Sequence, residues 1–224
     1  MNSPSEILDQ KGSQEKAYTY IKASILSLDF GPKRRLLAQE IAQKLDISRT
    51  PVREALSRLE QEGLVVRDSG WGYVVKAYGY DEALSLFNVR EALELQAIRE
   101  AVAHMDDRVV GMLESILLQA RSFLKSNRMT DFQASNRRFY GLIAQTTRNS
   151  ILQQFLGMIN DRIRILAALA MNRDPRRGVQ VMAENKQILD ALRTRDLAAA
   201  ENAVRTHIQR ATANVLSCLG DISK

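Results

Sequence analysis

The chain has 224 residues, of which 45% are apolar and 26% charged, an ordinary composition for two modest folded domains. Its single cysteine, Cys218, excludes a disulfide framework within one chain, and the longest apolar run, 165–171, is too short to cross a bilayer. The polar, acidic start of the chain is not a signal peptide, so we expect a soluble, cytoplasmic protein without a membrane partner.

The formal net charge of +6 favours an anionic partner, but it is spread along the chain. Residues 1–77 hold 12 Lys and Arg against 10 Asp and Glu, and the remainder holds 20 against 16. Binding to nucleic acid must therefore depend on local clusters, and each cluster taken alone is equally consistent with a solvated face. The clusters are Lys33, Arg34 and Arg35, and Arg49, Arg53 and Arg58.

The first part of the chain contains one candidate helix before its most informative segment. Residues 1–12 are predicted to be disordered, and apolar residues at helical spacing predict an amphipathic helix over 13–28. The sequence Phe30-Gly31-Pro32 is predicted to end this helix, since proline cannot continue it. Residues 33–37 are then expected to form a short extended link.

The segment 38–60 is predicted to form two short helices joined by a tight turn. Ser48 stands at the expected N-cap of the second helix, and Pro51 falls in its first turn, where the missing N–H costs nothing. An apolar-backed helix that presents arginines and short polar groups fits the major groove of DNA. The expected buried stripe is Val52, Ala55, Leu56 and Leu59, and the expected outward face is Arg49, Thr50, Arg53, Ser57 and Arg58.

A β-hairpin is predicted directly after this second helix. Gly63 stops the helix, and strands are expected over 64–67 and 72–75 around the turn residues Asp68-Ser69-Gly70. A helix-turn-helix followed by a hairpin is a winged helix-turn-helix, here over 13–77, with a linker at 78–80. Trp71, at the hairpin tip, either contacts a DNA groove or packs beneath the hairpin.

The remainder of the chain is predicted to be an all-helical domain over 81–220. Short connections that carry helix caps or breakers, such as Asp106 and Thr130, favour an antiparallel six-helix bundle. The expected fold class is therefore mainly α with a small β-hairpin wing. No catalytic motif is visible, so we expect no enzyme. The expected helices are 81–104, 107–126, 130–147, 150–171, 175–193 and 196–218.

The runs LDISRTPVREAL at 45–56 and LEQEGLV at 59–65 resemble the GntR family of bacterial transcriptional regulators. The helical part resembles the FadR subfamily and its FCD ligand-binding domain through weaker matches. These are VREALE at 89–94, NRRFY at 136–140, NSIL at 149–152, ENKQILDA at 184–191 and HI at 207–208.

The resemblance implies a homodimer that binds a palindromic double-stranded DNA operator and is released by a small metabolite. It assigns DNA contacts to Arg49 and Arg53, with a wing glycine in the minor groove, and it places Gln39 where relatives carry arginine. The alternative for Arg53 and Arg58 is ion pairing with Glu54 and Glu62. The full set of expected DNA-contacting residues is Arg35, Gln39, Ser48, Arg49, Thr50, Arg53, Arg58, Gly70 and Gly72.

Many FCD domains hold a divalent metal through one aspartate and three histidines, and the resemblance places four other side chains at these positions. They are Asn136, Tyr140, Asn185 and His207. One imidazole, two amides and a neutral phenol are poor zinc ligands, so we expect no zinc site and no cofactor. These polar groups are instead expected to bind a small organic effector, or else to pair with one another or with water.

Arg90 matches a family arginine that often reaches the pocket, and it is expected to pair with a ligand carboxylate. Arg162 is a weaker candidate for the same role, whereas Arg137 and Arg138 are expected on the surface. His207 is equally consistent with a satisfied core histidine. The sequence therefore predicts a ligand-responsive repressor, and the alternative is a sequence-independent architectural DNA-binding protein with a purely structural bundle.

Overall fold

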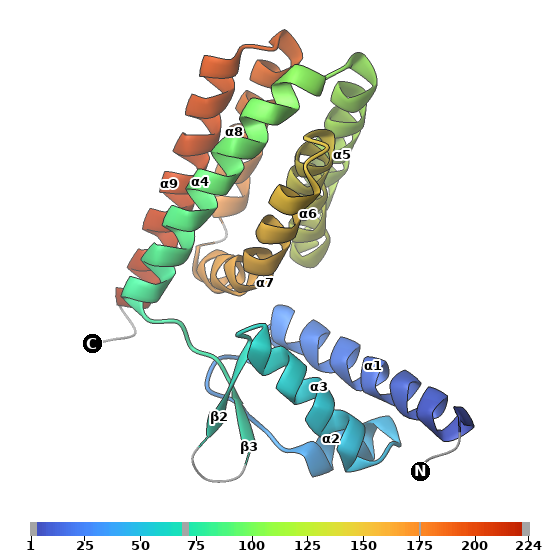
Figure 1. The fold of residues 1–224 in the computed structure, drawn as a ribbon. Helices are drawn as coiled ribbons and strands as arrows, with labels where there is room; N and C mark the ends of the chain where they lie inside the picture. Colours follow the sequence, from blue (N-terminus) through green and yellow to red (C-terminus); the bar gives the residue numbers. More distant parts are fainter. Residues whose placement is uncertain (1–3, 69–71, 175, 221–224) are drawn as a thin grey trace. The chain divides into compact units, whose positions relative to one another are not determined.

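The computed structural model describes residues 4–68, 72–174 and 176–220 and divides the chain into two compact units (Figure 1). The units are Met1–Tyr78 and Gly79–Lys224, so the division falls within the segment 78–80 that the sequence suggests as a linker. In the described ranges, no helix is long and apolar enough to cross a membrane.

The first unit begins with a longer helix than the sequence predicts. Helix α1 spans Pro4–Leu26, so the prediction of disorder over 1–12 is wrong from Pro4 onward. Glu, Leu, Gln and Lys in this stretch are good helix formers, although they form no apolar stripe. The helix ends before the predicted Phe30-Gly31-Pro32 breaker, because Leu28 already adopts the left-handed conformation with φ of 67°.

The helix-turn-helix consists of α2 (Ala38–Leu45) and α3 (Arg49–Gln61), joined through Asp46 in a left-handed conformation with φ of 54°. All four residues of the predicted stripe on α3 are fully buried, and α1 packs against this helix. Ser48 occupies the N-cap position as predicted, but its side chain makes no capping hydrogen bond. The expected hydroxyl cap is therefore wrong, and the Ser48 side chain stays exposed.

The wing is part of a three-stranded antiparallel sheet with the order β1-β3-β2. Strands β2 (Val65–Asp68) and β3 (Gly72–Val75) form the predicted hairpin. Strand β1 (Arg35–Leu36) lies where the sequence suggests only an extended link, and it pairs with β3. Burial of the Leu36 side chain holds this strand in place. The predictions for Gly70 and Trp71 fall outside the described residues.

The second unit contains the six predicted helices, with ends shifted by only a few residues. Helix α4 lies along α9, α5 packs against α6 and α8, and α7 contacts α4 and α9 (Figure 1). The helices are α4 (Tyr80–His104), α5 (Asp107–Lys125), α6 (Met129–Thr146), α7 (Ser150–Arg173), α8 (Arg177–Thr194) and α9 (Leu197–Gly220).

Side-chain caps fix several of these helix starts. Asp106 accepts a hydrogen bond from the Val109 N–H at 2.7 Å, and Asn149 accepts one from the Leu152 N–H at 3.0 Å. Each bond satisfies one of the backbone donors that a helix N-terminus leaves open. Thr130 is not a cap, because α6 begins one residue earlier, at Met129.

The packing predicts a large difference between two leucines of α5. Leu113 is fully buried and Leu118 is 63% exposed. Leu113→Ala leaves a cavity and is expected to lower the free energy of unfolding by about 2–5 kcal/mol, whereas Leu118→Ala is expected to change it by about 0.5 kcal/mol at most. Urea unfolding followed by circular dichroism measures both, and equal losses for the two variants would contradict the packing.

Candidate functional site

The N-terminal end of α3 presents a polar and cationic surface. Ser48, Arg49, Thr50 and Arg53 are all exposed there, and Gln39 is exposed on the neighbouring α2. The first N–H groups of a helix lack intrahelical partners and carry partial positive charge, so this end attracts anions such as phosphate. The structure thus brings five of the predicted DNA-contacting residues to adjacent helix surfaces.

Two further predicted residues lie on the sheet. Arg35 on β1 is largely exposed and holds Asp68 of β2 through an ion pair of 2.8 Å between Nη2 and Oδ2. Gly72 begins β3, and a Cβ there would lie 3.7 Å from the Leu36 carbonyl oxygen, an ordinary contact. The fold itself therefore does not require glycine at position 72. A glycine there is compatible with the close approach of another molecule, as the predicted DNA contact would need.

Arg58 has a different environment from Arg49 and Arg53. Its guanidinium stacks 3.5 Å from the centre of the Tyr18 ring, and Nη1 forms an ion pair with Glu15 of α1 at 2.9 Å. Its Nε lies 3.5 Å from the Glu62 carboxylate. These contacts favour the ion-pairing alternative for Arg58, with additional partners on α1 that the sequence did not suggest.

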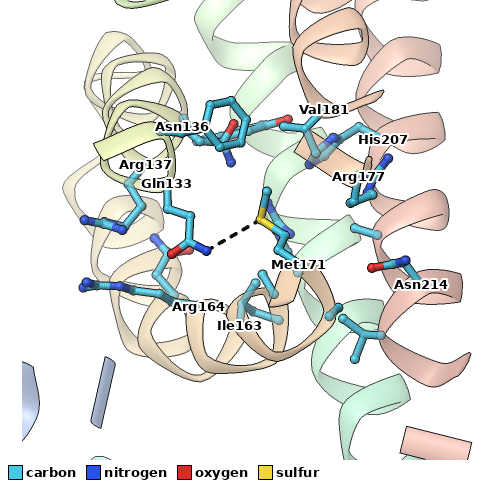
Figure 2. Close-up of a pocket in the computed structure, with 18 of the residues that line it drawn as sticks. Gln133, Asn136, Arg137, Ile163, Arg164, Met171, Arg177, Val181, His207 and Asn214 are labelled. Atoms are coloured by element: carbon cyan, nitrogen blue, oxygen red, sulfur yellow. Dashed lines mark hydrogen bonds between the residues drawn. The ribbon is translucent and has the colours of Figure 1, made fainter. Parts of the chain in front are cut away.

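A cavity of about 160 Å³ is lined by residues from α4, α6, α7, α8 and α9 of the second unit (Figure 2). Part of its lining is apolar, through Phe132, Ile163, Met171 and Val181. The polar lining includes the predicted residues Arg90, Asn136, Tyr140 and His207. The structure thus gathers side chains from distant parts of the sequence around one small space.

The two amides and the phenol form a hydrogen-bonded chain. The Tyr140 hydroxyl donates to the Asn185 Oδ1 at 3.0 Å, and the Asn185 Nδ2 donates to the Asn136 Oδ1 at 2.6 Å. Burial raises the pKa of Tyr140 well above its usual value, which keeps the phenol neutral and able to donate. These groups pair with one another, as the mutual-pairing alternative expects, and Asn185 itself does not line the cavity.

His207 belongs to a second buried network, which the sequence analysis missed. Its Nδ1 lies 2.8 Å from the Glu184 Oε2, and both oxygens of this carboxylate accept from Arg177, at 2.7 and 2.8 Å. Because a carboxylate only accepts, we assign the proton to Nδ1 of His207. Arg177 and Glu184 are seven residues apart on α8 and so lie on one face, but ion pairs on a helix are expected at spacings of three or four residues, so the sequence carries no direct signal for this pair.

The pKa values of this network follow from burial and pairing. Burial alone would raise the pKa of Glu184, but hydrogen bonds from His207 and Arg177 lower it to about 2. Burial lowers the pKa of His207 to about 4, even though Glu184 acts in the opposite direction. Near neutral pH the carboxylate is therefore ionised and the imidazole is neutral.

The donor set does not fit a transition metal such as zinc. His207 supplies one imidazole, Tyr140 is a neutral phenol, and the oxygens of Asn136 and Asn185 already accept hydrogen bonds. Zinc sites use imidazole, thiolate and carboxylate ligands. Within the described ranges, no three His, Cys, Asp or Glu side chains converge on one point.

Arg90 is a polar lining residue whose hydrogen-bonding capacity is only partly used. Its side chain is buried, and its Nε makes no hydrogen bond with any described residue. The nearest carboxylate oxygen, on Glu94, is 3.6 Å away, and burial raises the pKa of Glu94 although Arg90 opposes this shift. The four-residue spacing on α4 was the signal for this pair, which the sequence analysis did not use.

Helix α7 lines the cavity with a different arginine from the one that the sequence analysis predicted. Residues at helical spacing on one face of α7 line the cavity, namely Asn160, Arg164, Ala167 and Met171. Arg162 is on the opposite face, because it lies two residues from both Asn160 and Arg164, and it does not line the cavity. Arg164 occupies the position in the cavity lining that the sequence analysis assigned to Arg162. Arg137, expected only on the surface, is exposed but also lines the cavity edge.

Comparison with family models agrees with this architecture. Residues 85–210 match the FCD domain, and residues 13–75 match the gntR family of bacterial regulatory proteins. The Bacillus subtilis (strain 168) HTH-type transcriptional regulator YdhC is 24% identical over 191 residues, 85% of each chain. An HTH-type transcriptional regulator of Streptomyces ambofaciens is 27% identical over 193 residues, which is 86% of this chain and 80% of the relative.

Solved structures show the same fold. The structure of E. coli McbR/YncC has a TM-score of 0.79 at 20% identity, and the match covers 91% of this chain and 96% of that one. A structure described as a GntR transcriptional regulator from Rhodococcus sp. RHA1 also has a TM-score of 0.79 at 20% identity, with 91% and 97% covered.

The low pKa of His207 predicts acid destabilisation in a defined window. Between pH 6.5 and 4 the unfolded state binds a proton that the folded state does not, so stability falls as the pH falls. Urea unfolding at pH 6.5 and pH 5 is expected to show a loss of about 1.5 kcal/mol from this residue. In His207→Gln this loss of unfolding free energy between pH 6.5 and pH 5 should vanish. In the control His104→Gln, which changes the exposed histidine, the loss should persist.

The contacts of Arg58 predict that Arg58→Ala destabilises the first unit. Loss of the ring contact and the ion pairs is expected to cost about 1 kcal/mol, measurable by thermal unfolding, whereas Arg53→Ala should leave stability unchanged. The reverse pattern, unchanged stability with a loss of DNA binding equal to that of Arg53→Ala, would assign Arg58 to the DNA-contacting set instead.

Proposed function

We propose that this chain, which belongs to the FCD-containing gntR family of bacterial regulatory proteins, is an operator-specific transcriptional repressor of the FadR subfamily. It binds a palindromic double-stranded DNA operator as a homodimer in the cytoplasm, and a small organic effector, a carboxylate, releases it. The observation that carries the proposal is the exposed pair Arg49 and Arg53 at the start of a helix whose other face is fully buried.

The DNA-binding part rests on the chemistry of α3. A guanidinium can bind the O6 and N7 atoms of guanine with two hydrogen bonds, which contributes about 1–3 kcal/mol of base discrimination. Phosphate at the helix N-terminus fixes the register of these contacts. Since residues 1–77 carry only two more basic than acidic residues, one copy is expected to bind weakly, and a dimer that joins two copies supplies the required affinity.

The effector part rests on the cavity and on Arg90. Burying a guanidinium without full hydrogen bonding is costly, and a carboxylate ligand would offset that cost by pairing with the Arg90 guanidinium, which lines the cavity. An engineered apolar cavity of about 150 Å³ holds a benzene-sized molecule, so this one suits a small metabolite. The ligand changes operator affinity only to the extent that it prefers one state of the dimer over another.

Selection of duplexes from a random DNA library with the full chain tests this function. We expect enrichment of an inverted repeat, and Arg49→Ala or Arg53→Ala should each weaken binding to it by about 5- to 100-fold in fluorescence anisotropy. Arg138→Ala, which changes an exposed arginine of α6, serves as the matched control and should bind as the unaltered protein does.

The same fluorescence anisotropy assay tests whether a carboxylate releases the protein from its operator. Short-chain carboxylates added to the complex are expected to lower operator affinity in the unaltered protein but not in Arg90→Gln. Enrichment of no sequence, together with equal affinity for scrambled duplexes, would favour the sequence-independent architectural alternative.

A further inference from the structure

Four arginines line the cavity, and they differ in how well carboxylates compensate their charge. Arg177 is fully matched, because it donates two hydrogen bonds to the two oxygens of Glu184. The pair is buried, with Glu184 only 1% exposed. Arg177 therefore contributes no unsatisfied positive charge to a ligand.

Arg90 is only partly matched. The separation of 3.6 Å between its Nε and the Glu94 Oε1 is too long for a good hydrogen bond, and the Nε has no other described partner. The guanidinium also lies 5.6 Å from the centre of the Tyr140 ring, so it faces the amide and phenol end of the cavity. One anionic group can bind here, as the proposed function requires.

A second cationic place lies at the edge of the cavity, where Arg137 of α6 and Arg164 of α7 run side by side (Figure 2). Asp161, which also lines the cavity, is the carboxylate that acts on both guanidinium groups. The Arg164 Nε is buried and makes no hydrogen bond with any described residue. Partial burial lowers the pKa of Arg137, whose side chain is otherwise exposed, and repulsion from Arg164 lowers it further.

One carboxylate against two guanidinium groups leaves one positive charge at this edge. We propose that Arg137 and Arg164 form a second anionic subsite and that the effector is a short dicarboxylate, with one carboxylate on Arg90 and the other on this pair. The inference rests on the proposed function and specifies its ligand. Apolar lining such as Ile163 and Met171 suits the hydrocarbon that joins the two carboxylates.

Matched pairs of acids of equal chain length test this inference by titration calorimetry of the full chain. The pairs are butyrate and succinate, pentanoate and glutarate, and hexanoate and adipate. At least one dicarboxylate is expected to bind about tenfold or more tightly than its monocarboxylate partner. Equal affinities within every pair, or no binding of any of the six acids, would overturn the inference.

Variants then locate the second subsite. Arg137→Gln and Arg164→Gln should lower affinity for the preferred dicarboxylate about tenfold and change monocarboxylate affinity less than about twofold. Arg90→Gln should lower the affinity for both the dicarboxylate and the monocarboxylate. Arg138→Gln is the matched control, because Arg138 is exposed on α6 and donates to Gln119 outside the cavity. Arg164→Lys keeps the charge and should retain most of the preference if Arg164→Gln fails to fold.

The outcomes separate this inference from the proposed function. If monocarboxylates bind through Arg90 and release the operator, but Arg137→Gln and Arg164→Gln leave the dicarboxylate preference intact, only the second subsite is wrong. If operator binding is sequence-specific but no acid binds or releases it, both the second subsite and the carboxylate effector are wrong, and the DNA-binding part of the function stands.

Discussion

The buried carboxylate of Glu184 is the constraint on which the interior of the helical unit depends. A charge in this environment is tolerated because Arg177 and His207 donate hydrogen bonds to it from α8 and α9, and Arg210 of α9 adds a longer contact of 3.4 Å to Oε1. The same bonds fix the imidazole so that its ring lies 5.3 Å from the ring of Tyr140. One ionised side chain thus aligns two helices and one wall of the cavity.

The polar interior consists of two kinds of group with different consequences for recognition. In the amide and phenol chain from Tyr140 to Asn136, each side chain has a hydrogen-bond partner within the chain, so part of its polar capacity is already used. In contrast, the Nε atoms of Arg90 on α4 and Arg164 on α7 are buried and make no hydrogen bond with any described residue. Anion recognition by guanidinium groups would therefore replace the metal coordination that the FCD pattern implies in many other domains.

Periodic patterns made most of the fold predictable. The stripe on α3 and the six helices of the second unit follow from apolar spacing, and the polar residues 136, 140, 185 and 207 converge as expected. Strand β1 could not be predicted in this way, because two residues carry no periodicity. The partners of Arg58 on α1 depend on tertiary packing. The exchange of Arg162 for Arg164 depends on the rotation of α7 about its axis, which alternating arginines in DRIRIL leave undetermined.

The pairing of β1 with β3 has a mechanical consequence for reading DNA. The Lys33 N–H donates to the Val75 carbonyl, and the Val75 N–H donates to the Arg34 carbonyl, each at 2.9 Å, so the chain entering α2 is fastened to the wing. The wing cannot swing as an independent arm while α3 stays in place. In the proposed complex, a duplex must therefore present groove widths that suit the helix and the wing at once, and DNA stiffness becomes part of what the unit would discriminate.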